Sequence, residues 1–122
     1  MSKSLRKEVL EYVEKKYNVK AEYPWMKSPD YAVLRHSDNN KWFALVMDIS
    51  KEKLGINEQE LVDVINVKCD PTLIGSLRLK EGFFAAYHMN KEHWITIILD
   101  RTVNIDEIYE LIDLSYDLTK KK

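Results

Sequence analysis

Two amphipathic segments, one near each end of the chain, place the strongest constraint on its fold. Within residues 2–17 the apolar side chains recur with the 3.6-residue period of a helix, at Leu5, Val9, Tyr12, Val13 and Tyr17. The same period returns in residues 104–118, at Ile105, Ile108, Tyr109, Ile112 and Tyr116. Ser2 or Ser4 can cap the first helix, and Asn104 with Glu107 has capping-box spacing for the second. Each helix therefore needs another element against which to bury its apolar stripe.

The chain between these helices is rich in strand-forming residues. Residues 31–36 and 41–48 are rich in β-branched and aromatic residues and flank the turn-forming residues 37–40, which predicts a β-hairpin. Residues 61–68, with three valines and an isoleucine, predict a third strand. Residues 83–88 and 93–99 predict two more strands around a polar tip at 89–92. Because both alternating sets within 93–99 are largely apolar, we expect an inner strand that is covered on part of each face.

A short internal helix is predicted between the third and fourth strands. Asp70 is a good N-cap, and Pro71 suits the first helical position, so the helix should run to about Leu79, before Gly82. Residues 51–60 predict a polar connection around Gly55, with one helical turn at residues 57–60 as the alternative. The expected fold is a single α+β domain over residues 1–122. In it, the N- and C-terminal helices pack on one face of an antiparallel sheet.

Composition restricts the environment and the partners of the chain. A length of 122 residues suits one hydrophobic core, and no apolar run reaches the length of a membrane span. Cys69 is the single cysteine, and the first residues lack the apolar region of a signal peptide, so we expect a cytoplasmic protein. With 19 Lys and Arg against 20 Asp and Glu, dense coating of nucleic acid is disfavoured, whereas a local basic patch stays open.

Three separated motifs carry a family resemblance. NVKCDP at residues 66–71, AYHMNKEHWITIILD at 86–100 and LIDLSYDL at 111–118, together with KWFALVMD at 41–48, resemble the MmcQ/YjbR-like family of small bacterial proteins. The resemblance implies a CyaY/frataxin-like α+β fold and DNA binding through a "double wing" of β-hairpins. It supplies no catalytic motif. The signature positions of the family correspond here to Lys68, His88, Asn90, Lys91, His93, Trp94, Ser115 and Tyr116.

The candidate binding residues gather around the tip of the predicted second hairpin. Basic, polar and aromatic side chains suited to phosphates and bases are Lys68, Arg78, His88, Asn90, Lys91, His93 and Trp94. The leading hypothesis is a non-enzymatic, monomeric domain that binds DNA weakly through its hairpin wings. The alternative is a module that recognises a small molecule or a protein with the cluster at residues 88–94 and neighbouring aromatic side chains.

Other chemistries find less support in the sequence. His88 and His93 would need further ligands to hold a metal, and Cys69 and Asp48 are the candidates. A nucleophilic Cys69 paired with either histidine competes with a buried, inert thiol at the end of a strand. A frataxin-like acidic ridge is interrupted by lysines, because Glu8, Glu11 and Glu14 alternate with Lys7, Lys15 and Lys16. We therefore expect no catalytic residue, metal, cofactor or membrane association.

Overall fold

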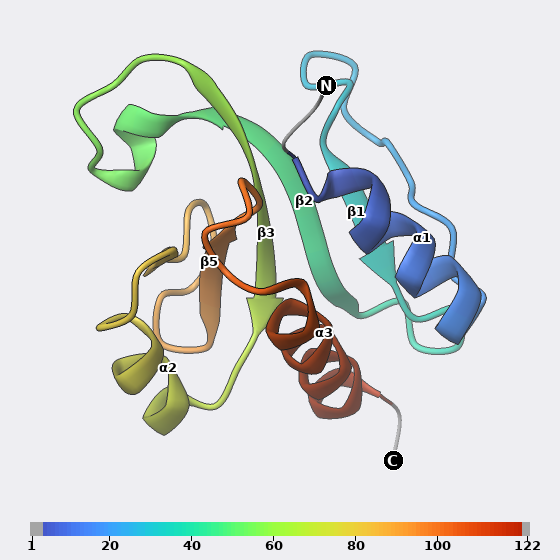
Figure 1. Cartoon of the computed structure of the whole chain (residues 1–122). Helices are drawn as coiled ribbons and strands as arrows, with labels where there is room; N and C mark the ends of the chain where they lie inside the picture. The colour runs from blue at the N-terminus through green and yellow to red at the C-terminus, as the bar shows by residue number, and fades with distance from the viewer. Residues whose placement is uncertain (1–3, 121–122) are drawn as a thin grey trace.

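The computed structural model describes residues 4–120, in which three α-helices and a five-stranded sheet are joined by loops (Figure 1). In chain order the elements are α1 (Arg6–Tyr17), β1 (Ala32–Arg35), β2 (Trp42–Ser50), the 3₁₀ helix η1 (Lys51–Leu54), β3 (Leu61–Lys68), α2 (Pro71–Leu77), β4 (Phe83–Ala85), β5 (Trp94–Ile98) and α3 (Ile105–Thr119). The strand order is β1-β2-β3-β5-β4, and each neighbouring pair is antiparallel. The predicted α+β class is confirmed.

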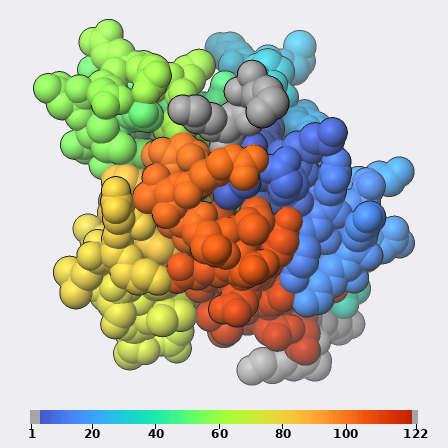
Figure 2. All heavy atoms as spheres, viewed as in Figure 1, coloured from blue at the N-terminus to red at the C-terminus, as the bar shows by residue number. Residues whose placement is uncertain are grey.

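All three α-helices pack on one face of the sheet and form what we call the helix layer. Their buried apolar side chains, Val9, Val13, Ile74, Leu77, Ile108 and Ile112, belong to one cluster with alternate strand residues such as Val46, Ile65 and Ile97. From this side, α1, α3 and the segment that leads into α3 lie in front of much of the sheet (Figure 2). The prediction that both terminal helices cover the same face is therefore confirmed.

The structure shortens several predicted elements for identifiable reasons. The predicted Ser2 cap lies outside the described residues, and α1 begins after Ser4, whose hydroxyl accepts from the Arg6 N–H at 3.0 Å. The predicted helical turn at residues 57–60 does not form; η1 comes earlier, with Ser50 as its cap and Gly55 at a φ of 83° after it. The strand predicted over residues 83–88 stops at Ala85, because the backbone of Tyr87 bonds side chains rather than a neighbouring strand.

A buried serine on α3 fastens this helix to the sheet. The register of β2 and β3 pairs Ala44 with Val67, so Phe43 and Lys68 would form the next rung of the ladder. The Ser115 hydroxyl occupies that rung, accepting from the Lys68 N–H at 2.8 Å and donating to the Phe43 carbonyl at 2.6 Å. It thereby satisfies two backbone groups that the strands leave unpaired.

A buried histidine closes the far end of the same helix. His36 is 3% exposed and follows β1, and its Nε2 lies 2.8 Å from the hydroxyl of Thr119 at the end of α3. The rings of Phe43 and Tyr116 pack around the imidazole. Burial lowers the pKa of His36 below its ordinary value, so the folded protein holds this side chain neutral.

Replacing Ser115 with Ala should destabilise the protein by about 1–3 kcal/mol, because a buried N–H and a buried C=O lose their partner. Chemical denaturation measures the change. Ser76→Ala is the matched control, since Ser76 is an exposed helical serine and its replacement should alter stability by only a few tenths of a kcal/mol. Equal effects of the two substitutions would show that Ser115 does not bridge the strands.

The buried His36 predicts a loss of stability in mild acid. The unfolded chain takes up a proton as the pH falls through about 6.5, whereas the folded chain resists doing so until a lower pH. The contribution of His36 is therefore complete above about pH 6.5 and declines below it. Urea denaturation at about pH 7.5 and about pH 5.5 should show a larger loss for the parent chain than for His36→Gln. An identical loss in both proteins would contradict this assignment.

Candidate functional site

The face of the sheet opposite the helix layer is covered by loops, and we call it the loop-covered face. A second apolar cluster lies on it, made of Val33, Leu45, Met47, Ile49, Val64 and Ile98. Loop side chains pack over this cluster: Leu54 and Ile56 from η1 and the residues after it, Tyr31 from before β1, and Tyr87 and Met89 from residues 86–93. Loops of this kind, positioned by a rigid sheet, are a common place for binding residues.

A buried polar network fixes residues 86–93 on the loop-covered face. Asn66 of β3 and Thr96 of β5 are cross-strand neighbours, and both are 0% exposed. The Thr96 hydroxyl donates to Asn66 Oδ1 and accepts from the Tyr87 N–H at 3.0 Å. The Asn66 side-chain amide donates to the Tyr87 carbonyl at 2.8 Å. Both backbone polar groups of Tyr87 are thus held by strand side chains.

The predicted hairpin tip is a folded turn held by its own hydrogen bonds. Asn90 organises the turn: its side-chain oxygen accepts from the Glu92 N–H at 2.8 Å, and its carbonyl accepts from the Trp94 N–H at 3.0 Å. Lys91 closes the turn by donating to the Ala86 carbonyl at 3.0 Å. Met89 packs on the sheet, so this part of the turn lies against the loop-covered face.

Three basic side chains line one groove beside edge strand β4, and we call it the basic groove. Its volume is about 440 Å³, and its lining residues are Lys53, Leu54, Arg78, Phe83, Phe84, Ala85, Ala86, Tyr87 and Lys91. This lining contains three cations and no carboxylate. Within residues 4–120, the side chains of Lys53 and Arg78 form neither an ion pair nor a hydrogen bond. The groove is therefore a place where positive charge is available to a ligand.

Two lysines close in sequence to these cations are paired with glutamates and do not contribute free positive charge. Lys51, two residues before Lys53, is held by Glu58 and Glu60 at 3.0 and 2.5 Å. Lys80, two residues after Arg78, pairs with Glu107 of α3. Neither Lys51 nor Lys80 lines the basic groove.

An aromatic hollow lies on the other side of residues 86–89. Its volume is about 350 Å³, and it is lined by Trp25, Ser28, Tyr31, Trp42, Leu45, Met47, His88 and Met89. The Trp25 ring stands edge-on to Tyr31 and to Trp42, with interplanar angles of 79° and centroid distances of 6.1 and 5.7 Å. Trp25 is 37% exposed, so part of this aromatic surface is open to solvent.

The predicted site residues divide among different places. Arg78 and Lys91 line the basic groove, and His88 lines the aromatic hollow. Lys68 and Trp94 are half-buried cross-strand partners at the end of the sheet and line neither cavity. Exposed His93 lies near the α2 cap, where hydrogen bonds from Thr72 lower the pKa of Asp70 and His93 adds to the effect.

Lys53 lines the basic groove and Trp25 lines the aromatic hollow, and neither residue was predicted from the sequence. Lys53 lies in a connection that reads as solvated polar chain, and Trp25 lies between two prolines with no motif around it. Only the packing of loops over the sheet brings them to these sites. The polar interruptions at Asn66 and Thr96, inside otherwise apolar strands, were the available signal, because buried polar groups almost always have hydrogen-bond partners.

The geometry gives no support to the metal and nucleophile alternatives. Among residues 4–120, no group of three or more His, Cys, Asp or Glu side chains could hold a metal ion. Cys69 is 2% exposed, and burial raises the pKa of its thiol, which disfavours the reactive thiolate. It contacts His93 through the backbone, with its N–H donating to the His93 carbonyl at 2.9 Å. No helix in the described part of the chain is long and apolar enough to cross a membrane.

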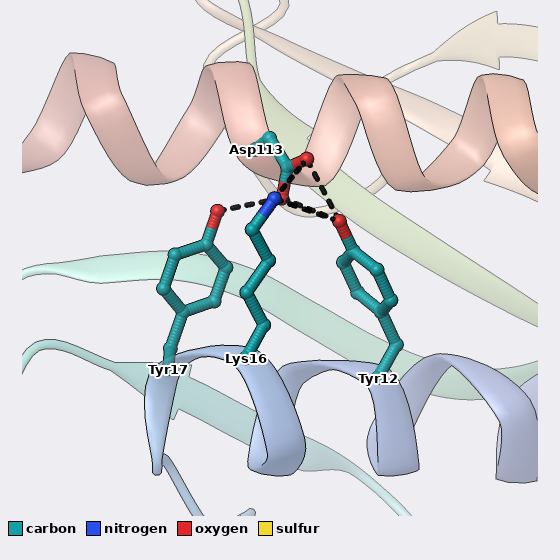
Figure 3. Close-up of polar contacts among 4 residues, drawn as sticks. All are labelled: Tyr12, Lys16, Tyr17 and Asp113. Carbon is teal, nitrogen blue, oxygen red and sulfur yellow. Dashed lines mark hydrogen bonds and ion pairs between the residues drawn. The ribbon is translucent and has the colours of Figure 1, made fainter.

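The polar cluster between α1 and α3 has a structural role (Figure 3). The carboxylate of Asp113 accepts from the hydroxyls of Tyr12 and Tyr17 and from the Lys16 ammonium, at 2.7, 2.5 and 2.8 Å. Burial would raise the pKa of Asp113, but the hydrogen bonds from Lys16, Tyr17 and Tyr12 outweigh it and lower the pKa. The Asp113 carboxylate on α3 therefore joins this helix to three side chains of α1.

Replacing Thr96 with Val should loosen the loop that separates the two cavities. The substitution keeps the shape of the side chain but leaves the Tyr87 N–H and the Asn66 oxygen without a partner, at a cost of about 1–3 kcal/mol each. Hydrogen exchange at the Tyr87 amide should accelerate more than exchange in α1. Thr102→Val, at an exposed threonine, is the control. Unchanged exchange at Tyr87 would contradict the role of this network.

Comparisons with known proteins place the chain in a family. The family model described as YjbR matches residues 14–118. Protein YyaQ of Bacillus subtilis (strain 168) is 45% identical over 115 residues, covering 94% of this chain and 98% of YyaQ. A crystal structure of a Pseudomonas syringae protein is 55% identical with a TM-score of 0.92, covering 94% of this chain and 98% of that chain.

A more distant structure agrees on the fold. The Deinococcus radiodurans protein DR2400, with a DUF419 domain, has a TM-score of 0.74 at 22% identity, covering 98% of this chain and 80% of that chain. None of these relatives is named for an activity, so function has to be inferred from geometry. The family model spans most of the chain, and the B. subtilis relative matches nearly its whole length: the chain belongs to the YjbR family.

Proposed function

We propose that this chain is a non-enzymatic DNA-binding domain that holds the phosphate backbone along the basic groove. The observation that carries the proposal is the convergence of Lys53, Arg78 and Lys91 on one groove without a carboxylate. These cations come from η1, the end of α2 and the loop before β5, and they meet in a chain whose net charge is -1. A local concentration of positive charge attracts phosphates even when the net charge does not.

The chemistry of the groove suits phosphate contacts. Arg78 offers a planar fork of N–H donors to phosphate oxygens, and the lysine ammonium groups act as point charges beside it. Phe84 and Tyr87 add aromatic surface next to these cations. Such contacts position a nucleic acid and carry little sequence information, which fits the weak and non-specific binding that we infer.

The distribution of negative charge supports this orientation. The exposed acids of α1 and α3, including Glu11, Glu14, Asp106, Glu110 and Asp117, belong to the helix layer. The basic groove lies beside edge strand β4, between the end of α2 and the loops that fold over the opposite face. DNA would therefore approach the β4 edge and avoid the acidic helices. The single cysteine of the chain favours a cytoplasmic location, where DNA is accessible.

The aromatic hollow favours a second candidate, which is recognition of a small planar molecule. Its rings and the apolar side chains of Leu45 and Met47 could bury such a ligand without any polyanion. This candidate predicts binding that is insensitive to salt, whereas phosphate binding weakens steeply as salt rises.

Charge reversal in the groove should weaken DNA binding. Fluorescence anisotropy with a labelled duplex at about 50 mM and about 200 mM salt measures the affinity and its salt dependence. Lys53→Glu, Arg78→Glu and Lys91→Glu should each lower the affinity and reduce the slope of log K against log salt by about 0.9.

Lys20→Glu is the matched control, because it changes the net charge equally at an exposed position that follows α1. It should leave the affinity within about twofold of the parent, since distant exposed charges are screened. Absence of binding at about 50 mM salt would overturn the proposal. So would an equal loss of affinity from Lys20→Glu.

A further inference from the structure

We propose that the aromatic hollow is a nucleobase site, in which one unpaired base packs against Trp25 while its phosphates lie in the basic groove. This inference rests on the proposed function and adds to it a preference for single-stranded over duplex DNA. Nucleic-acid-binding proteins without sequence preference commonly combine a basic groove with aromatic side chains on which bases stack.

The two cavities share a wall, which places a phosphate and a base within reach of each other. Tyr87 lines the basic groove, and the adjacent His88 and Met89 line the aromatic hollow. Neighbouring Cα atoms are about 3.8 Å apart, so the linings of the two cavities meet at this point of the chain. The rings of Tyr87 and His88 also contact each other, with their centroids 3.9 Å apart and their planes tilted by 48°.

The shape and chemistry of the hollow suit one planar ring. Its volume of about 350 Å³ is near the lower end of the roughly 300–1,000 Å³ typical of ligand sites. Leu45 and Met47 from β2 are buried apolar side chains in its lining. Ser28 and His88 provide polar groups that can hydrogen-bond the edges of a base.

The loop that carries Trp25 is already folded for such a contact. The Ser28 N–H donates to the Trp25 carbonyl at 3.3 Å, and the Tyr31 N–H donates to the Ser28 carbonyl at 3.1 Å. The Arg6 guanidinium donates to the carbonyl of Asp30 from the side of α1. Holding the aromatic side chains in place before binding lowers the ordering cost that binding would otherwise incur.

Duplex DNA cannot use the hollow without being opened. Bases in a duplex are stacked on both faces, and extruding one costs a few kcal/mol. A single strand presents its bases without that cost, while its phosphates still reach Lys53, Arg78 and Lys91. The basic groove alone would accept either form of DNA, so the preference is specific to the base site.

The test compares three probes of equal length: an oligothymidylate of about 12 nucleotides, the corresponding duplex, and an abasic sugar–phosphate oligomer. Anisotropy at about 50 mM salt should rank the oligothymidylate first, with the abasic oligomer and the duplex at least about fivefold weaker. The oligothymidylate should also quench tryptophan fluorescence, and the abasic oligomer should not.

Trp25→Ala should weaken binding of the oligothymidylate by about 5- to 150-fold, as loss of one stacked base predicts, and leave the abasic oligomer unaffected. Tyr23→Ala removes an exposed aromatic side chain outside the hollow and should change neither affinity. Equal binding of the oligothymidylate and the abasic oligomer would overturn the base site while leaving phosphate binding intact. Failure of all three probes to bind would overturn the proposed function and the base site together.

Discussion

The hydrogen bonds that Asn66 and Thr96 make to the backbone of Tyr87 decide the shape of the loop-covered face. Both are buried polar side chains on a sheet face whose other buried residues are apolar. By satisfying both polar groups of Tyr87, they end β4 after three residues and turn the chain over the sheet. The basic groove and the aromatic hollow exist as separate cavities because that segment runs between them.

The molecule thus divides its tasks between two layers. In the helix layer, Ser115 completes a rung of the sheet and Asp113 joins α3 to the hydroxyls of α1. These two polar groups therefore hold the fold together. At the β4 edge and in the loops on the opposite side, Lys53 of η1 and Arg78 at the end of α2 have no partner among residues 4–120, and Trp25 keeps part of its surface exposed. Side chains that make no intramolecular hydrogen bond or ion pair are available to bind a ligand.

The sequence predicted elements whose signals are local, and it missed arrangements that depend on tertiary contacts. The stripes of α1 and α3, the Asp70 cap of α2 and the limits of β3 followed from periodicity, capping and β-branched residues. The end of β4 did not, because Thr96 lies nine residues beyond Tyr87 and competes with the strand ladder only after folding. Likewise, the sequence identified Arg78 and Lys91 as candidate binding residues. It did not identify Lys53, which the fold of η1 brings to the same groove.

NMR titration of the ¹⁵N-labelled chain with a single-stranded oligonucleotide would show directly whether DNA binds at the loop-covered face and the β4 edge. If DNA binds there, amide shifts should change at Lys53, Arg78 and residues 83–91, together with the indole N–H signals of Trp25 and Trp42. Signals from α1 and α3 should stay in place. Shifts confined to the helix layer, or no shifts at low salt, would contradict binding at this site.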